Sequence, residues 1–334
     1  MTEKNNKKTI FGWSLYDWAK SAYETTTLGA ILPVYFVSVV VPAEGFNFRG
    51  NLYTGAEVWG FAIGSALFIF FLIMPTIGAI GDLSGNRMKL FKIFAYGGAV
   101  FASTFYFATS GDVIFTLGIY FLAQFGATGS NVFYDSVLKD ITTDDTIDTV
   151  SARGYALGYL GGGLQLVISL ALIQLGPDML GIETAMASRI AISSAGLWWL
   201  IFSIMSFSRM KITESQPVSI EGSIFANAYS KNFKTLKKIR KFPFLMYFLI
   251  AYLFYWDGLQ TVINMSAAYF TEVLLLDQTQ IIIVFIVVQF VAYFGAKLAG
   301  VMVKRIGQKN TLYYTMFLIF LVGNAAAFIP EKQF

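Results

Sequence analysis

The residues GAIGDLSGNRMKL at positions 78–90 decide the fold, because they join two long apolar stretches in a way that recurs further along the chain. The stretch GVMVKRIGQKNTL at 300–312 repeats their order of a glycine, three residues, a charge, two residues, a glycine, one residue and a cation. The matched positions are Gly78, Asp82, Gly85 and Arg87 in the first copy and Gly300, Lys304, Gly307 and Lys309 in the second. Repeated bundles of apolar helices are typical of secondary transporters.

Composition on either side of these loops indicates an integral membrane protein. Of the 334 residues, 56% are hydrophobic and 13% are charged, and the mean hydropathy is +0.62; a soluble domain has about 25% charged residues. Cysteine and histidine are absent, which excludes disulfides, thiolate nucleophiles, Cys/His metal sites and a histidine proton relay. We expect no metal and no cofactor, and we attribute the net charge of +4 to basic loops rather than to nucleic-acid binding.

Nine stretches are long and apolar enough to cross a bilayer as helices, which takes roughly 20 residues each. The first is too polar and aromatic at its start for a cleaved signal peptide, so we interpret it as a retained span. The predicted spans are approximately 12–41, 57–80, 91–109, 113–138, 153–175, 190–207, 244–270, 280–303 and 311–329. The sequence therefore predicts an all-α, multi-pass membrane protein.

Basic residues support both this topology and its orientation. With the N-terminus in the cytoplasm, 20 of the 24 Lys and Arg residues fall on the cytoplasmic side, as the positive-inside rule requires. We divide the chain into a six-helix bundle at 1–207, a basic cytoplasmic linker at 208–243 and a partial bundle of three spans at 244–334. The linker stretch 225–238 is either a helix on the anionic leaflet or a solvated tether.

The loop at 78–90 resembles the signature loop between helices two and three of the major facilitator superfamily, Gly-x-Leu-Ala-Asp-Arg-x-Gly-Arg-Arg/Lys. Leu83 departs from that pattern, and in the second copy Lys304 stands where an acid is common. Three further segments, WSLYDWAKSAY at 13–23, SARGYALGYLGGG at 151–163 and YWDGLQT at 255–261, are similar to the vacuole-effluxer-like branch. That branch includes autophagy-linked exporters of amino acids, so the resemblance implies a solute transporter, and amino acids as one substrate class.

The resemblance also implies twelve spans, of which we expect six plus three here. Either the sequence is a fragment of a twelve-span protein, which we favour, or the protein has nine spans. A bacterial inner membrane is the simplest location that fits the branch.

Three predicted spans carry polar residues on one helix face each, and charges within a bilayer usually line a functional cavity. The resemblance implies that spans one, four and seven line the central cavity. The candidate substrate- or ion-binding residues are Asp17, Lys20 and Glu24 in span one, Gln124, Thr128, Asn131 and Asp135 in span four, and Asp257, Gln260 and Asn264 in span seven.

Their roles stay open between alternatives. Asp257 is either a reversible proton carrier or one partner of a structural ion pair. Asp17 and Lys20 either grip a zwitterionic solute or form an interfacial i, i+3 ion pair. Gly154, Gly158 and Gly162 allow close helix packing, which we favour over ligand contact.

The resemblance assigns gating to the loop at 78–90, where Gly78, Asp82, Gly85 and Arg87 latch helix ends together, with Arg153 as a candidate partner. The predicted function is a secondary transporter that moves a small solute by alternating access, with protons as a candidate coupling ion. The alternative is a non-transporting receptor or assembly partner on the same fold. An enzyme or an ATP-driven pump is disfavoured, because no hydrolase elbow, zinc helix or Walker loop occurs.

Overall fold

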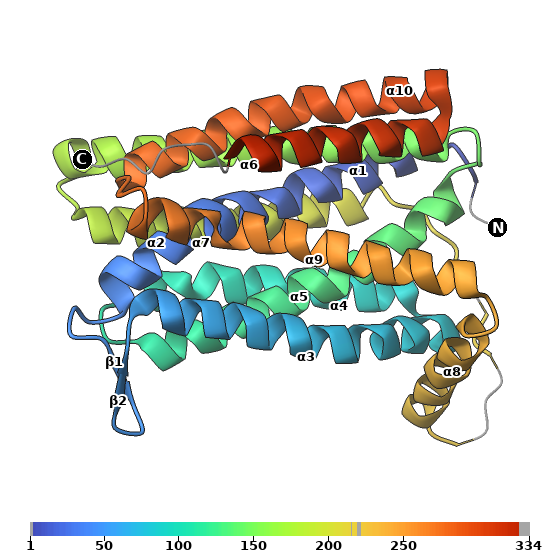
Figure 1. The fold of residues 1–334 in the computed structure, drawn as a ribbon, viewed down its shortest axis with the longest axis horizontal. Coiled ribbons are helices and arrows are strands. Elements are labelled where there is room, and N and C mark those ends of the chain that lie inside the picture. The colour runs from blue at the N-terminus through green and yellow to red at the C-terminus, as the bar shows by residue number, and fades with distance from the viewer. Residues whose placement is uncertain (1–2, 215, 219–221, 327–334) are drawn as a thin grey trace.

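The computed structural model describes residues 3–214, 216–218 and 222–326, and nearly all of them are helical (Figure 1). The first span contains α1 (Lys7–Ala22), a π-helix (Tyr23–Ile31), α2 (Leu32–Tyr35) and a second π-helix (Phe36–Val40). The remaining elements are β1 (Phe46–Phe48), β2 (Asn51–Tyr53), α3 (Gly55–Ser84), α4 (Arg87–Ser103), a 3₁₀ turn (Thr104–Phe107), α5 (Val113–Ile141), α6 (Ile147–Leu180), α7 (Thr184–Phe207), α8 (Ile224–Ile239), α9 (Pro243–Glu272) and α10 (Gln278–Ala326).

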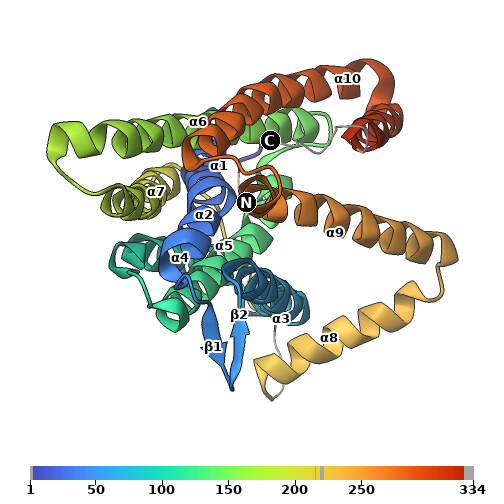
Figure 2. The ribbon, with the colours of Figure 1, turned by 60° about the vertical axis from the view of Figure 1, so that its left-hand side comes forward.

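Seven helices in the described chain are long and apolar enough to cross a membrane, and α8 with α9, bent by 112°, make an eighth candidate. The first six coincide with the first six predicted spans. The seventh, α10, covers the last two predicted spans but contains a break at Gly307, where φ is 80° and ψ is 162°. The chain reverses there (Figures 1 and 2), so the limbs of α10 correspond to the predicted 280–303 and to the described part of 311–329.

The helix α3 shows how local sequence fixes the boundaries of the signature loop. Thr54 and Glu57 form a capping box at its start, with the Thr54 N–H donating to Glu57 Oε2 at 2.8 Å and the Glu57 N–H to Thr54 Oγ1 at 3.3 Å. Gly85 ends the helix in the left-handed conformation, with φ of 69°, which glycine adopts without a steric penalty. A short turn to α4 follows directly.

A small β-hairpin precedes α3, and the sequence pattern did not predict it. Phe46, Asn47 and Phe48 pair with Tyr53, Leu52 and Asn51 in antiparallel register. The two turn residues, Arg49 and Gly50, both have positive φ, as the tight turns of hairpins require.

Close helix packing in the first bundle depends on the glycines of α6. A Cβ added at Gly158 would lie 2.7 Å from Ser21 Oγ, one at Gly161 would lie 2.5 Å from the Trp18 carbonyl oxygen, and one at Gly162 would lie 2.6 Å from Thr25 Oγ1. These distances leave no room for a side chain, so α6 lies directly against the first span. The packing interpretation of this glycine series is confirmed.

The amphipathic segment of the linker is a helix, α8, which lies beside the end of α3 and is bent sharply from α9 (Figures 1 and 2). The Lys231 ammonium is 3.3 Å from Asp82 Oδ2 at the end of α3. The Asn232 amide donates to Thr76 Oγ1 at 3.4 Å. The start of α1, the turn between α3 and α4 and the reversal within α10 lie at the same end of the molecule (Figure 1).

The glycine contacts predict that Gly161→Ala destabilises the fold, because its Cβ would overlap the Trp18 carbonyl. We expect a loss of about 1–3 kcal/mol in the free energy of unfolding, measured by SDS titration in mixed micelles. Gly118→Ala in α5 is the matched control, since a Cβ there meets nothing within 4 Å and alanine favours helix. Equal stability of the two variants would contradict the close approach.

Candidate functional site

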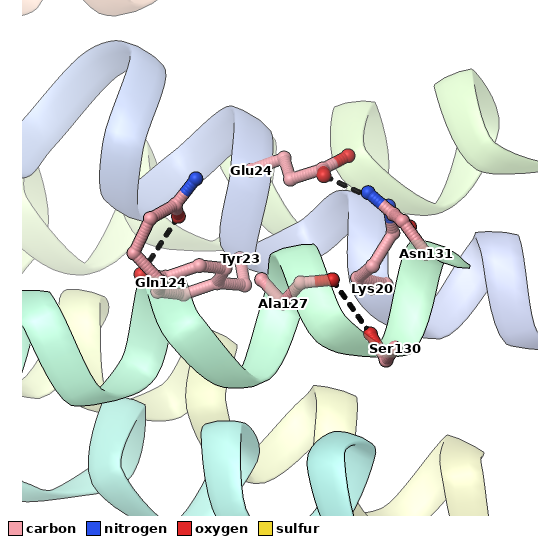
Figure 3. Close-up of polar contacts among 7 residues, drawn as sticks. All are labelled: Lys20, Tyr23, Glu24, Gln124, Ala127, Ser130 and Asn131. Atoms are coloured by element: carbon pink, nitrogen blue, oxygen red, sulfur yellow. Dashed lines mark hydrogen bonds and ion pairs between the residues drawn. The ribbon is translucent and has the colours of Figure 1, made fainter. Parts of the chain in front are cut away.

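A buried lysine forms the centre of the candidate site. Lys20 on α1 is only 4% exposed, and its ammonium is 2.8 Å from Glu24 Oε1. It also donates to the side-chain oxygen of Asn131 on α5 (Figure 3). A lone charge within a bilayer costs about 2.5–3.5 kcal/mol on insertion scales, and these two partners offset that cost. The Glu24 side chain remains 42% exposed, so the cluster has one open carboxylate.

Asp17 lies one turn earlier on the same helix and is 6% exposed. Its Oδ2 would be 2.9 Å from a Cβ at Gly158, so the absence of a side chain on α6 makes room for the carboxylate. The described residues contain no Asp17–Lys20 salt bridge. The i, i+3 ion pair considered above is therefore wrong, and Lys20 pairs at i, i+4 with Glu24 instead.

Two of the four residues in the polar stripe of α5 are in hydrogen-bonding contact with the first span. The Tyr23 hydroxyl lies 3.5 Å from Gln124 Oε1 (Figure 3), and Asn131 contacts Lys20. Thr128 is half-buried between them, whereas Asp135 is exposed toward the end of the helix. The structure thus brings together candidates from the first and fourth predicted spans.

Among the described residues, Asp257 and Gln260 of α9 make no hydrogen bond or ion pair with this cluster. Asp257 is exposed and Gln260 is half-buried, and the side chain of Asn264 lies outside the described residues. The backbone carbonyl of Asp257 accepts a hydrogen bond from Thr261 Oγ1 at 2.9 Å. No hydrogen bond in the described chain links the Asp257 carboxylate to the Lys20 cluster, so its role remains a prediction.

Two polar residues beside the cluster were not among the predicted site residues. Gln289 on α10 is 8% exposed, and its amide donates to Thr25 Oγ1 at 3.1 Å. Its Oε1 is buried without a hydrogen-bond partner in the described part of the chain. An amide isolated within the apolar run 281–294 was the signal that could have revealed it.

The predicted gating loop is held by two ion pairs. Arg87, at the start of α4, pairs with Asp140 Oδ2 near the end of α5 at 2.9 Å, and Lys231 pairs with Asp82. Gly78 lies against Val132 on α5, whose Cγ1 would be 3.2 Å from an added Cβ. Arg153 lies elsewhere, in a groove between α6 and α10.

Comparison with known families decides what kind of protein presents this arrangement. Residues 139–329 match the family described as "Vacuole effluxer Atg22 like". The chain belongs to the Atg22-like vacuole effluxer family. The "Uncharacterized MFS-type transporter YxiO" of Bacillus subtilis (strain 168) is 30% identical over 318 residues, which cover 95% of this chain and 72% of that protein.

A fungal relative gives a shorter match. "Autophagy-related protein 22" of Cryptococcus neoformans var. neoformans serotype D (strain B-3501A) is 29% identical over 189 residues, 55% of this chain and 34% of that protein. No solved structure matches. The predicted family and the all-α membrane fold are confirmed: this Atg22-like chain is a multi-pass membrane protein of a family of transporters rather than enzymes.

The buried cluster of this Atg22-like protein predicts energetic coupling between Lys20 and Glu24. Lys20→Gln leaves Glu24 without its cation, and we expect it to cost about 1–3 kcal/mol of unfolding free energy. The double variant K20Q/E24Q should lose less than the sum of the single losses, with an interaction energy of about 0.5–3 kcal/mol. SDS titration of the four proteins measures the cycle, and simple additivity would show that the pair is not formed.

Proposed function

We propose that this protein is a secondary transporter that moves a small zwitterionic solute, with amino acids as the leading class, by alternating access. The observation that carries the proposal is the Lys20–Glu24–Asn131 cluster. It lies between the first span and α5, which is the fourth span of a transporter-type bundle. It offers an ammonium, an open carboxylate and an amide within one site. A solute carboxylate fits beside Lys20 and a solute ammonium beside Glu24 or Asp17.

The names of the relatives support the class of function. One is called an MFS-type transporter and another an autophagy-related protein. Neither name gives a substrate, a direction or a coupling ion. The choice of amino acids therefore depends on the charges of the site and on the resemblance of the sequence to the effluxer branch.

In this proposal, two bundles rock about the site, one built from 1–207 and one that begins at 244, joined by the linker 208–243. The turn between α3 and α4 is the gate, and Arg87–Asp140 and Lys231–Asp82 stabilise its closed arrangement. We place the N-terminus and the basic loops in the cytoplasm and the protein in a bacterial inner membrane.

The gate predicts that Arg87→Gln opens the cytoplasmic side. A partly exposed ion pair is worth about 0.2–1 kcal/mol, so we expect an increase of about 1.4- to fivefold in the labelling rate of a cysteine introduced as Thr128→Cys. The chain has no native cysteine, so a membrane-impermeant maleimide added to inside-out vesicles reports on that site alone. The control is Lys89→Gln, which removes an exposed neighbouring cation; equal labelling in both variants would contradict the gate.

We further propose that transport is coupled to protons and that Glu24 or Asp257 carries the proton. Both are acids within predicted spans, and Glu24 is the open carboxylate of the cluster. If one carries the proton, its amide variant still exchanges solute for solute but no longer responds to a pH gradient. Counterflow and pH-driven flux separate these two properties.

We therefore predict the outcome of transport assays in proteoliposomes with a labelled amino-acid panel. Wild type should show counterflow of one substrate class. E24Q or D257N should lower its pH-driven flux at least tenfold, and Lys20→Met should abolish counterflow. Asp145→Asn, an amide change in an exposed loop, is the matched control and should keep both activities.

The negative outcomes are equally informative. Unchanged pH-driven flux in both amide variants would rule out these acids as carriers. Folded wild-type protein without flux of any amino acid would favour another solute or a non-transporting receptor on the same fold.

A further inference from the structure

A groove at the seam between α6 and α10 is separate from the candidate solute site. Its volume is about 430 Å³, within the range of pockets that hold small organic groups. Arg153 of α6 and Lys297 and Lys304 of α10 line it, together with Leu157, Leu160 and Tyr293. The groove therefore takes its positive charges from both helices.

The groove is polar at one end and apolar at the other. Lys304 stands three residues before the reversal at Gly307, and Arg153 stands near the start of α6, so both lie toward the end of the bundle that carries the basic loops. Leu160 is two turns further along α6, about 10 Å deeper, and Tyr293 is about 16 Å from Lys304 along α10. The contacts of Gly163 with Gln289 and of Gly300 with Ala152 show that α6 and α10 run antiparallel. Leu160 of α6 and Tyr293 of α10 therefore lie at a similar depth, at the apolar end of the groove.

The charges of the groove are not neutralised by acids in its lining, which contains neither Asp nor Glu. The nearest acid in sequence, Asp148, accepts two hydrogen bonds from the Gln308 amide at 3.0 and 2.9 Å. Lys297 lies over the ring of Tyr293, with its Nζ 4.4 Å from the ring centroid. Three cations thus face one groove, and all three side chains are exposed.

The groove and the solute site occupy different faces of α6. Gly154, Gly158 and Gly161 pack on the first span, which carries Asp17 and Lys20. Arg153, Leu157 and Leu160 follow at i, i+4 and i+7 on another face. A molecule in the groove therefore does not occupy the space beside Lys20.

We propose that this groove binds an anionic phospholipid, with its phosphate between Arg153, Lys297 and Lys304 and an acyl chain along Leu157 and Leu160. Basic pockets between membrane helices on the cytoplasmic side are suited to acidic head groups, and the change from charged to apolar along the groove matches the two parts of a phospholipid. The bound lipid bridges α6 and α10, which belong to the two halves of the chain. This site does not depend on the proposed substrate.

The test uses the full chain, purified and delipidated, with phosphatidylglycerol and phosphatidylcholine of identical acyl chains titrated against it in native mass spectrometry. We expect wild type to prefer phosphatidylglycerol. K297Q/K304Q should lower its affinity for phosphatidylglycerol roughly 25-fold, because each cation near the membrane surface contributes about fivefold to the affinity for an anionic lipid, and should leave phosphatidylcholine binding unchanged. K297R/K304R should keep the preference. The control K234Q/K237Q removes two lysines of α8 outside the groove and should keep it as well.

A second variant keeps the test valid if the glutamine variant does not fold. Leu157→Trp fills the apolar end without touching the charges and should also weaken phosphatidylglycerol binding. Equal binding of the two lipids by wild type, or an unchanged preference in folded K297Q/K304Q, would overturn the proposal. Displacement of phosphatidylglycerol by millimolar inorganic phosphate would show that the groove recognises free phosphate instead of a lipid.

Discussion

The rest of the structure depends on the requirement that a buried ammonium be matched by partners. Lys20 lies deep among the helices, and its partners come from the π-helical segment of its own span and from α5. A lysine in that position without them would leave an unpaired charge in the bilayer. The contact therefore ties the first span to α5, and the Tyr23–Gln124 contact joins the same two elements one helical turn or more away.

The glycines of α6 make the second contribution to this arrangement. By omitting side chains opposite Trp18, Ser21 and Thr25, they let α6 approach the first span closely enough to enclose Asp17. An adjacent face of the same helix packs against α10, whose Gln289 lies beside Gly163 and donates to Thr25. One helix thus connects the first bundle to the second half of the chain, and van der Waals packing rather than the hydrophobic effect holds such contacts together inside a membrane.

Much of this fold follows from the sequence because its signals are local. Apolar length places the first six spans, and the glycine spacing of α6 indicates close packing. The capping residues Thr54 and Glu57 also mark where α3 begins. The sequence could not give the partners of Lys20, because Asp17 and Glu24 are both one turn away and Asn131, its other partner, is more than a hundred residues distant.

Other features were missed for related reasons. The hairpin at 46–53 is too short to carry a pattern, and the contact of Gln289 with Thr25 joins the two halves of the chain. The position of Asp257 relative to the cluster depends on how α9 lies against the first bundle, which no local signal reports. Only the isolated amide in an apolar run offered a hint for Gln289.

The π-helical segment Tyr23–Ile31 has a geometric consequence for the whole first span. Its backbone bonds reach back five residues, as from the Leu32 N–H to the Thr27 carbonyl, so each turn holds more residues than an α-helical turn. A helical wheel drawn from Asp17 with the α-helical repeat therefore no longer gives the correct direction of the side chains after Glu24. The direction of the side chains at one end of the span is therefore not set by their direction at the other end. The first end directs Lys20 toward α5, and the second buries Ile31, Leu32 and Phe36 completely. One span can thus present a charged residue at one depth and large buried apolar residues at another, along positions that a uniform α-helix would place on the same face.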